Sequence, residues 1–300
     1  FLISRYVFDI FICIWLNQQK TYCIITNVYR KGYLLVIRNC DCNGEVRRKM
    51  KKIDIHCHVL PKLDDGSASF QESIRMLKLA HRQGIQAVAA TPHYSHQFRQ
   101  EDPEKIKNLC RRLEVKARAE VDPDFRIYPG EEIFYSQETL EMLKRNQLLT
   151  IGESRYILIE FMPNVPYSLL YRAMRELTEE QYSPILAHME RYGVLREKGR
   201  VEELIKAGAY MQMNYRRIGG KWYDETVRWC RKMLKNGRVH FLATDMHNTK
   251  SRRPQTQEAE AWMEKHLEKA YIEEISWKNA EKIFSEAEPN VGKNVQSTTF

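Results

Sequence analysis

From Met50 onward, short apolar runs alternate with longer stretches of helical periodicity, and this alternation constrains the fold most strongly. Each run is five to seven residues long and ends near a turn or a charged segment. Such alternation is typical of parallel strands that are each followed by a helix crossing back to the next strand. The predicted strands span Lys52–His56, Ile85–Thr91, Arg126–Gly130, Tyr156–Phe161, Ser183–His188, Ala209–Asn214 and Val239–Thr244.

The stretches between these strands carry signals for helix starts and stops. Ser69 and Glu72 form a capping box, Gly84 is suited to ending the helix that follows, and Pro103 suits a first helical turn. No Gly-rich phosphate loop follows any predicted strand, so a closed or nearly closed (β/α)7 barrel suits this α/β chain better than an open doubly wound sheet. The predicted helices span Ser69–Arg82, Pro103–Ala119, Gln137–Asn146, Ser168–Gln181, Val201–Lys206, Asp224–Asn236 and Gln255–Lys269.

Residues 1–49 differ in composition from the rest of the chain. They contain no Pro and no Met, four of the seven cysteines, and five of the nine net positive charges. We interpret this segment as upstream read-through or a non-native extension, with translation beginning at Met50; the alternative is a genuine β-rich extension. We expect one domain over residues 50–285 and a loose C-terminal tail over residues 286–300.

Composition after residue 49 narrows the class of protein. The remaining net charge of +4 is too small to indicate nucleic-acid binding. Cys57, Cys110 and Cys230 are widely spaced, which is typical of reduced thiols in a cytoplasmic protein. No stretch approaches the roughly 18 apolar residues that span a bilayer, so we expect no membrane insertion. The sequence leaves the oligomeric state open.

Histidines and carboxylates gather at the C-terminal ends of six of the seven predicted strands. His56 and His58 are two residues apart and therefore point to the same face of their strand. In a barrel the strand ends converge at one mouth, where unpaired carboxylates repel one another and bound cations relieve the repulsion. Mixed imidazole and carboxylate ligands suit Mn, Fe or Zn, and the set is too large for one ion. Besides these two histidines it contains Asp65, His93, the Glu131-Glu132 pair, Glu160, His188, Asp245 and His247.

Other residues of metal-binding type receive a structural interpretation. His81 and His266 fall on predicted helices, and His240 has the opposite strand parity to Asp245. Cys57 has the opposite parity to its histidine neighbours, so we interpret it as a packed thiol. His96 lies in a loop three residues past His93, and its role stays open.

Taken in order, six motifs resemble the PHP (polymerase and histidinol phosphatase) superfamily. More narrowly, they resemble the CpsB/CapC family of manganese-dependent bacterial protein-tyrosine phosphatases, over Met50 to Phe284. The motifs are His56-Cys57-His58, Thr91-Pro92-His93, Pro129-Gly130-Glu131-Glu132-Ile133, Tyr156-Ile157-Leu158-Ile159-Glu160-Phe161, Ala187-His188-Met189-Glu190-Arg191 and Asp245-Met246-His247-Asn248.

The resemblance implies a distorted seven-stranded (β/α) barrel of the PHP type that holds three ions, with Mn²⁺ expected and Fe or Zn as alternatives. It also implies Asp65 rather than Asp64, and Glu132 rather than Glu131, as ligands. The implied ligand sets are His56, His58, Glu132 and Asp245 for the first ion, Glu132, Glu160 and His188 for the second, and Asp65, His93 and His247 for the third.

The implied activity is hydrolysis of protein phosphotyrosine by a metal-bound hydroxide, with a bacterial tyrosine kinase that controls capsule or exopolysaccharide synthesis as the expected partner. Arg191 and Arg252 lie on loops expected to overhang the mouth, where guanidinium groups suit phosphate. From Met50 onward no Cys is followed six residues later by Arg, so covalent cysteine catalysis is not expected there. The alternatives are a phosphatase of a small metabolite such as histidinol phosphate, a nuclease, which the weak basic balance disfavours, and a metal-binding regulator without activity.

Overall fold

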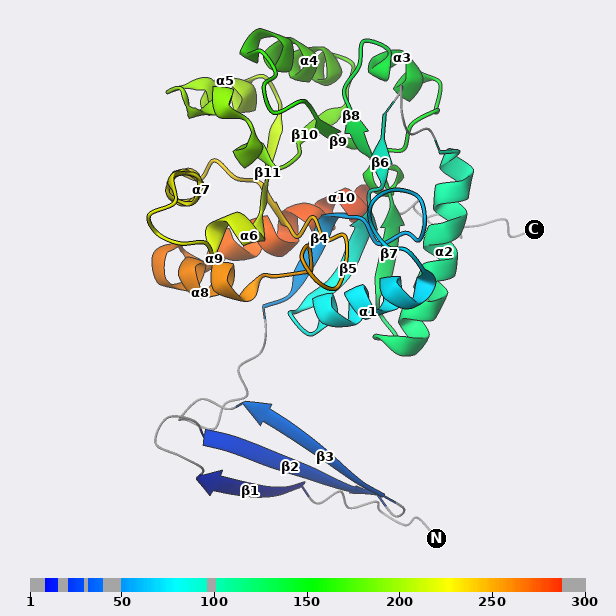
Figure 1. Cartoon of the computed structure of the whole chain (residues 1–300), viewed down its shortest axis with the longest axis vertical. Coiled ribbons are helices and arrows are strands. Elements are labelled where there is room, and N and C mark those ends of the chain that lie inside the picture. The colour runs from blue at the N-terminus through cyan, green and yellow to red at the C-terminus, as the bar shows by residue number, and fades with distance from the viewer. Residues whose placement is uncertain (1–8, 16–20, 30–31, 40–49, 96–100, 288–300) are drawn as a thin grey trace, which may run out of the picture. The chain divides into compact units, whose positions relative to one another are not determined.

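The computed structural model describes residues 9–15, 21–29, 32–39, 50–95 and 101–287 of the 300-residue chain (Figure 1). The chain divides into two compact units, Phe1–Met50 and Lys51–Phe300. His96, whose role the sequence left open, lies outside the described residues.

The first unit contains an antiparallel three-stranded sheet. Its strands are β1 (Asp9–Trp15), β2 (Thr21–Tyr29) and β3 (Gly32–Asn39), with β2 paired to both neighbours. Consecutive antiparallel strands joined by short connections form a meander. The interpretation of residues 1–49 as upstream read-through or a non-native extension stays a prediction, as does the alternative of a genuine extension.

The second unit is an α/β structure whose strands all pair in parallel and curl within a surround of helices (Figure 1). One sheet has the order β12-β11-β10-β9-β8-β6, and the other has the order β4-β5-β7. The parallel α/β class predicted from the alternating pattern is therefore confirmed. The strands are β4 (Lys52–Cys57), β5 (Ile85–Ala90), β6 (His93–Tyr94), β7 (Arg126–Pro129), β8 (Glu132–Phe134), β9 (Tyr156–Glu160), β10 (Ser183–Leu186), β11 (Tyr210–Asn214) and β12 (Phe241–Ala243).

Two segments of the chain each contribute one strand to one sheet and the following strand to the other sheet. Only Thr91 and Pro92 separate β5 from β6, and only Gly130 and Glu131 separate β7 from β8. Proline has no N–H group to give to a ladder, so the chain changes its pairing there. The Pro92 carbonyl still accepts a hydrogen bond of ordinary length, 3.0 Å, from the Glu132 amide.

The ends of β4 and β12 lie side by side. The Asp245 amide donates to the His56 carbonyl, and the His58 amide donates to the Met246 carbonyl, each over 2.9 Å. Asp54, buried on β4, accepts from the Thr244 amide over 3.0 Å. These bonds bring the first and last strand ends of the unit to one place.

Helices connect the strands, and their starts follow the predicted caps. The Ser69 hydroxyl accepts from the Glu72 amide, and Asp224 caps α7 through the amides of Thr226 and Val227. The short α6 and the C-terminal α9 and α10 were not predicted; α10 includes Glu286, one residue past the expected domain end. The helices are α1 (Phe70–His81), α2 (Pro103–Glu120), α3 (Thr139–Lys144), α4 (Tyr167–Glu179), α5 (Arg200–Lys206), α6 (Tyr215–Ile218), α7 (Glu225–Lys235), α8 (Gln257–His266), α9 (Lys269–Glu273) and α10 (Asn279–Ala287).

The two faces of β4 have different surroundings. Ile53 and Ile55 are buried in an apolar cluster with Ile283 and Phe284 of α10, while His56, the next residue, belongs to the opposite face. α10 therefore covers the apolar face of β4. No helix among the described residues has the length and apolarity needed to cross a membrane.

Three glycines in the connections between strands and helices test how these connections depend on backbone conformation. Gly208 has φ +97°, and a Cβ there would lie 2.4 Å from Thr178 Cγ2. Gly237 has φ +65° with open space, whereas Gly193 has open space and no left-handed φ. We expect Gly193→Ala to change the free energy of unfolding by less than about 0.5 kcal/mol, Gly237→Ala to lower it by about 1 kcal/mol, and Gly208→Ala by more than about 2 kcal/mol. Urea denaturation followed by circular dichroism measures the series, and three equal values would contradict this account of the connections.

Candidate metal centre

β4 brings two imidazoles into the interior of the second unit. His56 and His58 are fully buried, and their ring centroids lie 5.4 Å apart. His58 Nδ1 lies 2.6 Å from Asp64 Oδ2, so that carboxylate accepts the Nδ1 proton and leaves Nε2 facing inward. His58 therefore presents a lone pair at the centre of the strand ends.

Glu132, the first residue of β8, is the carboxylate on which the histidines converge. Its Oε2 lies 3.1 Å from His56 Nε2, 3.3 Å from His58 Nε2 and 3.0 Å from His93 Nδ1. Its Oε1 lies 2.7 Å from His188 Nε2. The residue is 1% exposed, and Oε2 has no hydrogen bond of good geometry within the described part of the chain. Nitrogen and oxygen donors crowded around a point without direct hydrogen bonds are arranged as ligands of a cation are.

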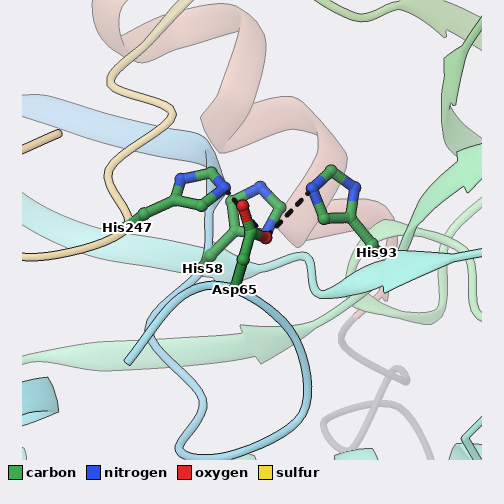
Figure 2. A group of neighbouring side chains, drawn as sticks. All are labelled: His58, Asp65, His93 and His247. Carbon is green, nitrogen blue, oxygen red and sulfur yellow. Dashed lines mark ion pairs between the residues drawn. The ribbon is translucent and has the colours of Figure 1, made fainter. Parts of the chain in front are cut away.

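Asp65 joins a second group at the mouth (Figure 2). Its Oδ1 lies 3.4 Å from His93 Nε2 and 3.5 Å from His247 Nε2, with the carboxylate between the two rings. His247 Nε2 is buried and has no hydrogen-bond partner among the described residues. His247 Nδ1 lies 3.0 Å from the Asp245 carbonyl, which requires a proton on Nδ1 and leaves the Nε2 lone pair directed at Asp65.

Asp245, two residues after β12, and Glu160, the last residue of β9, complete the cluster. Asp245 Oδ1 lies 3.6 Å from Nε2 of both His56 and His58. Glu160 Oε1 lies 3.1 Å from His93 Nδ1, and its Oε2 lies 3.5 Å from His188 Nε2. Carboxylates from two strands thus share imidazoles from three others.

Two site residues have strained backbones. His188 has φ +34° and Asp245 has φ +52°, a left-handed conformation that is uncommon for residues other than glycine. Both follow the ends of strands, where the turn directs their side chains inward. Such outliers persist only where the surroundings hold them, and they cluster at functional sites.

Charge is strongly coupled within the cluster. Burial alone would raise the pKa of Glu132, but His56 and the hydrogen bond to His188 hold it well below its usual range. Burial would lower the pKa of His58, yet Asp64 and Glu132 raise it to about 9, and Asp65, Glu132 and Glu160 raise that of His93 to about 12 against the same burial. The carboxylates are therefore ionised and require positive charge beside them, which bound cations or protons on the imidazoles can supply.

All nine predicted ligands lie in one site. Four overlapping groups have ligand atoms within 4.8 Å of one another, and among the described residues these groups contain the nine and no other residue. The grouping differs from the sets that the resemblance implies, because His58 also lies with the third set and His93 with Glu132 and Glu160. The groups are His58, Asp65, His93 and His247; His56, Glu132 and His188; His56, His58 and Asp245; and His93, Glu132 and Glu160.

Residues interpreted as structural lie outside these groups. Glu131 turns away and accepts from the Leu149 amide over 2.7 Å, and burial raises its pKa to about 8. Cys57 is buried, and its Sγ donates to the Ala89 carbonyl, as expected of a packed thiol. His240 accepts at Nδ1 from the Met211 amide, and burial lowers its pKa to about 4.

The arginines predicted to bind phosphate lie beside Asp245. Arg191 Nη2 donates to Asp245 Oδ2 over 3.0 Å, and Arg252 Nη2 donates to Asp245 Oδ1 over 2.8 Å. Arg252 also lies 3.5 Å from Asp65. Both guanidinium side chains are about a third exposed, 37% and 31%, so part of each faces outward from the cluster.

β11 contributes two amides that the sequence analysis missed. Gln212 Oε1 accepts from the His188 amide over 2.6 Å and lies 3.1 Å from His56 Nδ1. A backbone N–H fixes that atom as oxygen, so His56 carries its proton on Nδ1 and offers Nε2 to the cluster. Gln212 Nε2 then donates to Asn214 Oδ1, and Asn214 Nδ2 donates to Asp245 Oδ2. The shared strand parity of Gln212 and Asn214 was the signal, but a search confined to ionisable residues passed over it.

A family model described as "Capsular polysaccharide synthesis, CpsB/CapC" matches residues 52–285. The chain belongs to the CpsB/CapC family. The membership predicted from the motifs is thus confirmed.

Relatives of the CpsB/CapC family cover most of the second unit. Tyrosine-protein phosphatase YwqE of Bacillus subtilis (strain 168) is 34% identical over 220 residues, which is 72% of this chain and 85% of YwqE. Tyrosine-protein phosphatase CpsB of Streptococcus pneumoniae is 35% identical over 213 residues, 69% of this chain and 87% of CpsB. A solved structure is described as one of YwqE from Bacillus subtilis and CpsB from Streptococcus pneumoniae, metal-dependent tyrosine phosphatases. Its sequence is 30% identical to this chain, and the match covers 78% of this chain and 94% of the solved chain with a TM-score of 0.72.

The Gln212 bonds predict an effect on metal binding in this CpsB/CapC member. We expect Gln212→Leu to weaken Mn²⁺ binding to metal-stripped protein by about 10- to 100-fold, because His56 loses the acceptor that fixes its tautomer. Isothermal titration measures the affinity directly. Gln83→Leu is the matched control, since the Gln83 side chain also makes hydrogen bonds, to Leu79, Pro254 and Thr256, but away from the cluster. Equal affinities in the two variants would contradict a positioning role for Gln212.

Proposed function

We propose that the protein is a metal-dependent protein-tyrosine phosphatase. The observation that carries this proposal is the convergence of nine imidazole and carboxylate side chains on one buried site with two arginines at its edge. The relatives YwqE and CpsB, which are named tyrosine-protein phosphatases, support the substrate class. The family description supports a role in capsular polysaccharide synthesis. We further propose a bacterial tyrosine kinase as the phosphoprotein and the cytoplasm as the location.

We propose Mn²⁺ as the resident metal and three ions as the number, with Fe or Zn as alternatives. The donor set fits, because imidazoles and carboxylates together suit these ions and the site has too many ligand atoms for one. His56, His58, Glu132 and Asp245 would hold one ion, Glu132, Glu160 and His188 a second, and Asp65, His93 and His247 a third. When bound, such ions polarise phosphoryl oxygens and lower the pKa of water toward neutrality.

The chain's own residues position the phosphate. Arg191 and Arg252 are both held by Asp245, so their remaining N–H groups are fixed at the edge of the site rather than free in solvent. Guanidinium groups contact phosphate through paired hydrogen bonds and stabilise its charge while the ester bond breaks. A tyrosine leaving group departs as a phenolate, and because the pKa of its phenol is about 10, its departure depends less on a strong general acid.

Cysteine chemistry is not part of this proposal. Cys57, Cys110 and Cys230 are buried and free, and burial raises the pKa of each thiol well above its usual value, away from the range of a reactive thiolate. The nucleophile is accordingly water rather than a thiol of the second unit.

We also propose that the two sheets form one distorted seven-stranded barrel of the PHP type. The short breaks between β5 and β6 and between β7 and β8 support this, because each pair continues one strand from sheet to sheet. The backbone bonds that join His56 and His58 to the segment after β12 support closure. Closure accounts for how ligands from the first and last strands come to share one site.

The function is tested by metal dependence and substrate choice together. We expect a chelator to abolish hydrolysis of a phosphotyrosine peptide and added Mn²⁺ to restore it, because the cluster requires cations. Histidinol phosphate should be hydrolysed at least about tenfold less efficiently, a difference of about 1.4 kcal/mol in the barrier. Phosphate release measures both. Faster turnover of histidinol phosphate would make the metabolite phosphatase the correct assignment, and turnover in the absence of metal would exclude both.

The pair formed by Arg191 and Arg252, here called the arginine clamp, is tested separately. We expect Arg191→Ala and Arg252→Ala each to lower kcat/KM for a phosphotyrosine peptide by about 100-fold or more, because each removes a charged donor aimed at the phosphate. Arg253→Ala is the control, since this neighbouring arginine is exposed and lies outside the hydrogen bonds to Asp245. An equal loss in Arg253→Ala would show a general effect of positive charge rather than a positioned clamp.

A further inference from the structure

Two adjacent aromatic side chains beyond the C-terminal end of β11 are exposed. Among the described residues, Val115, Met162, Trp222 and Tyr223 are the large hydrophobic side chains that are mostly exposed. Val115 lies on α2, but Met162 follows the C-terminal end of β9, and the two aromatics lie between β11 and β12. Trp222 is 73% exposed and Tyr223 is 57% exposed. Adjacent exposed aromatics contribute little to a core, so they indicate a surface that binds something.

Trp222 and Tyr223 lie in the α6–α7 connection (residues 215–224), which begins at the C-terminal end of β11 (Figure 1, yellow). α6 starts directly after Asn214, whose amide donates to Asp245 of the centre. α7 must run back against the strand direction to reach the start of β12, so its N-terminus lies near the C-terminal strand ends. Trp222 and Tyr223 immediately precede that N-terminus.

The α6–α7 connection is held in place by its own bonds. Arg231 on α7 donates from Nε to the Ile218 carbonyl and from Nη2 to the Gly220 carbonyl, each over 3.1 Å. Asp224 caps α7 by accepting from the Thr226 amide over 2.8 Å. The exposed aromatics are therefore presented from an anchored turn, which lowers the entropy cost of using them for binding.

Positive charge accompanies the aromatic pair. Arg216 and Arg217 on α6 are exposed, and Lys221 Nζ lies 5.6 Å from the centroid of the Tyr223 ring. Arg216 is partly covered at its inner side: this partial burial and the nearby Arg252 guanidinium lower its pKa, which agrees with a position close to the arginine clamp. Cations and aromatic rings on one surface complement a polypeptide with acidic and apolar side chains.

We propose that the α6–α7 connection binds the polypeptide that flanks the phosphotyrosine. Trp222 and Tyr223 pack against apolar side chains of that polypeptide, while Arg216, Arg217 and Lys221 face its acidic groups. The inference rests on the proposed phosphatase function and adds the element that distinguishes a protein substrate from a small phosphate ester. The metal centre and arginine clamp contact only the phosphoryl group, which every monoester shares.

The test compares a large and a small substrate on one variant. The substrates are a synthetic peptide with phosphotyrosine between glutamate and leucine residues, and p-nitrophenyl phosphate, which has no flanking chain. We expect Trp222→Ala/Tyr223→Ala to raise KM for the peptide about tenfold, the equivalent of about 1.4 kcal/mol of binding, with kcat unchanged. Both constants for p-nitrophenyl phosphate should stay at the wild-type value. Val115→Ala, which removes an exposed apolar side chain from α2, should change neither substrate.

The outcomes separate this inference from the proposed function. If the wild type hydrolyses p-nitrophenyl phosphate but not the peptide, the assignment as a protein phosphatase fails, and the docking surface fails with it. If the wild type hydrolyses both and the double variant keeps its peptide KM, only the docking surface is overturned. A change in elution volume on size-exclusion chromatography with an unchanged peptide KM would identify a second copy of the chain as the occupant and overturn the proposal as well.

Discussion

A single buried carboxylate determines how the strand ends of the second unit are arranged. Glu132 is 1% exposed, and its two oxygens lie within 3.3 Å of nitrogen atoms from four histidines on three other strand regions. An ionised carboxylate in such a place is costly unless positive charge surrounds it. The strands that carry those histidines must therefore meet at β8, so the requirement of one side chain also constrains the sheet.

β11 shows why the cluster is not built from charged residues alone. Gln212 and Asn214 occupy positions where a carboxylate would face the same centre, yet both are amides. An amide oxygen accepts the His56 Nδ1 proton without adding negative charge to a site that already holds Asp65, Glu132, Glu160 and Asp245. The amides thus orient the ligands at no electrostatic cost, whereas Asp64 does the same for His58 with a charge that raises the imidazole pKa to about 9.

Much of the fold and of the site could be predicted because strand periodicity carries both. The two-residue repeat that buries Ile53 and Ile55 also places His56 and His58 together, so one pattern yields core and ligands. Other features leave no such signal. The four-residue α6 is too short for helical periodicity, and the Thr91-Pro92 break between β5 and β6 does not indicate that the chain continues in the other sheet. The amides of β11 have no charge to attract notice, and the left-handed backbone of His188 depends on the surrounding turn rather than on residue type.

Rigidity of the centre limits what it can select. Its ligands extend from strand ends and are fixed by outer hydrogen bonds, so the site offers every phosphate monoester the same charges at the same positions. Two substrates that share a phosphoryl group can be distinguished only by contacts made elsewhere. Those contacts must come from the connections that follow the strands. Among the described residues, the α6–α7 connection offers adjacent exposed aromatics beside positive charge, so in our proposal the specificity for a polypeptide depends on a surface that the chemistry itself does not require.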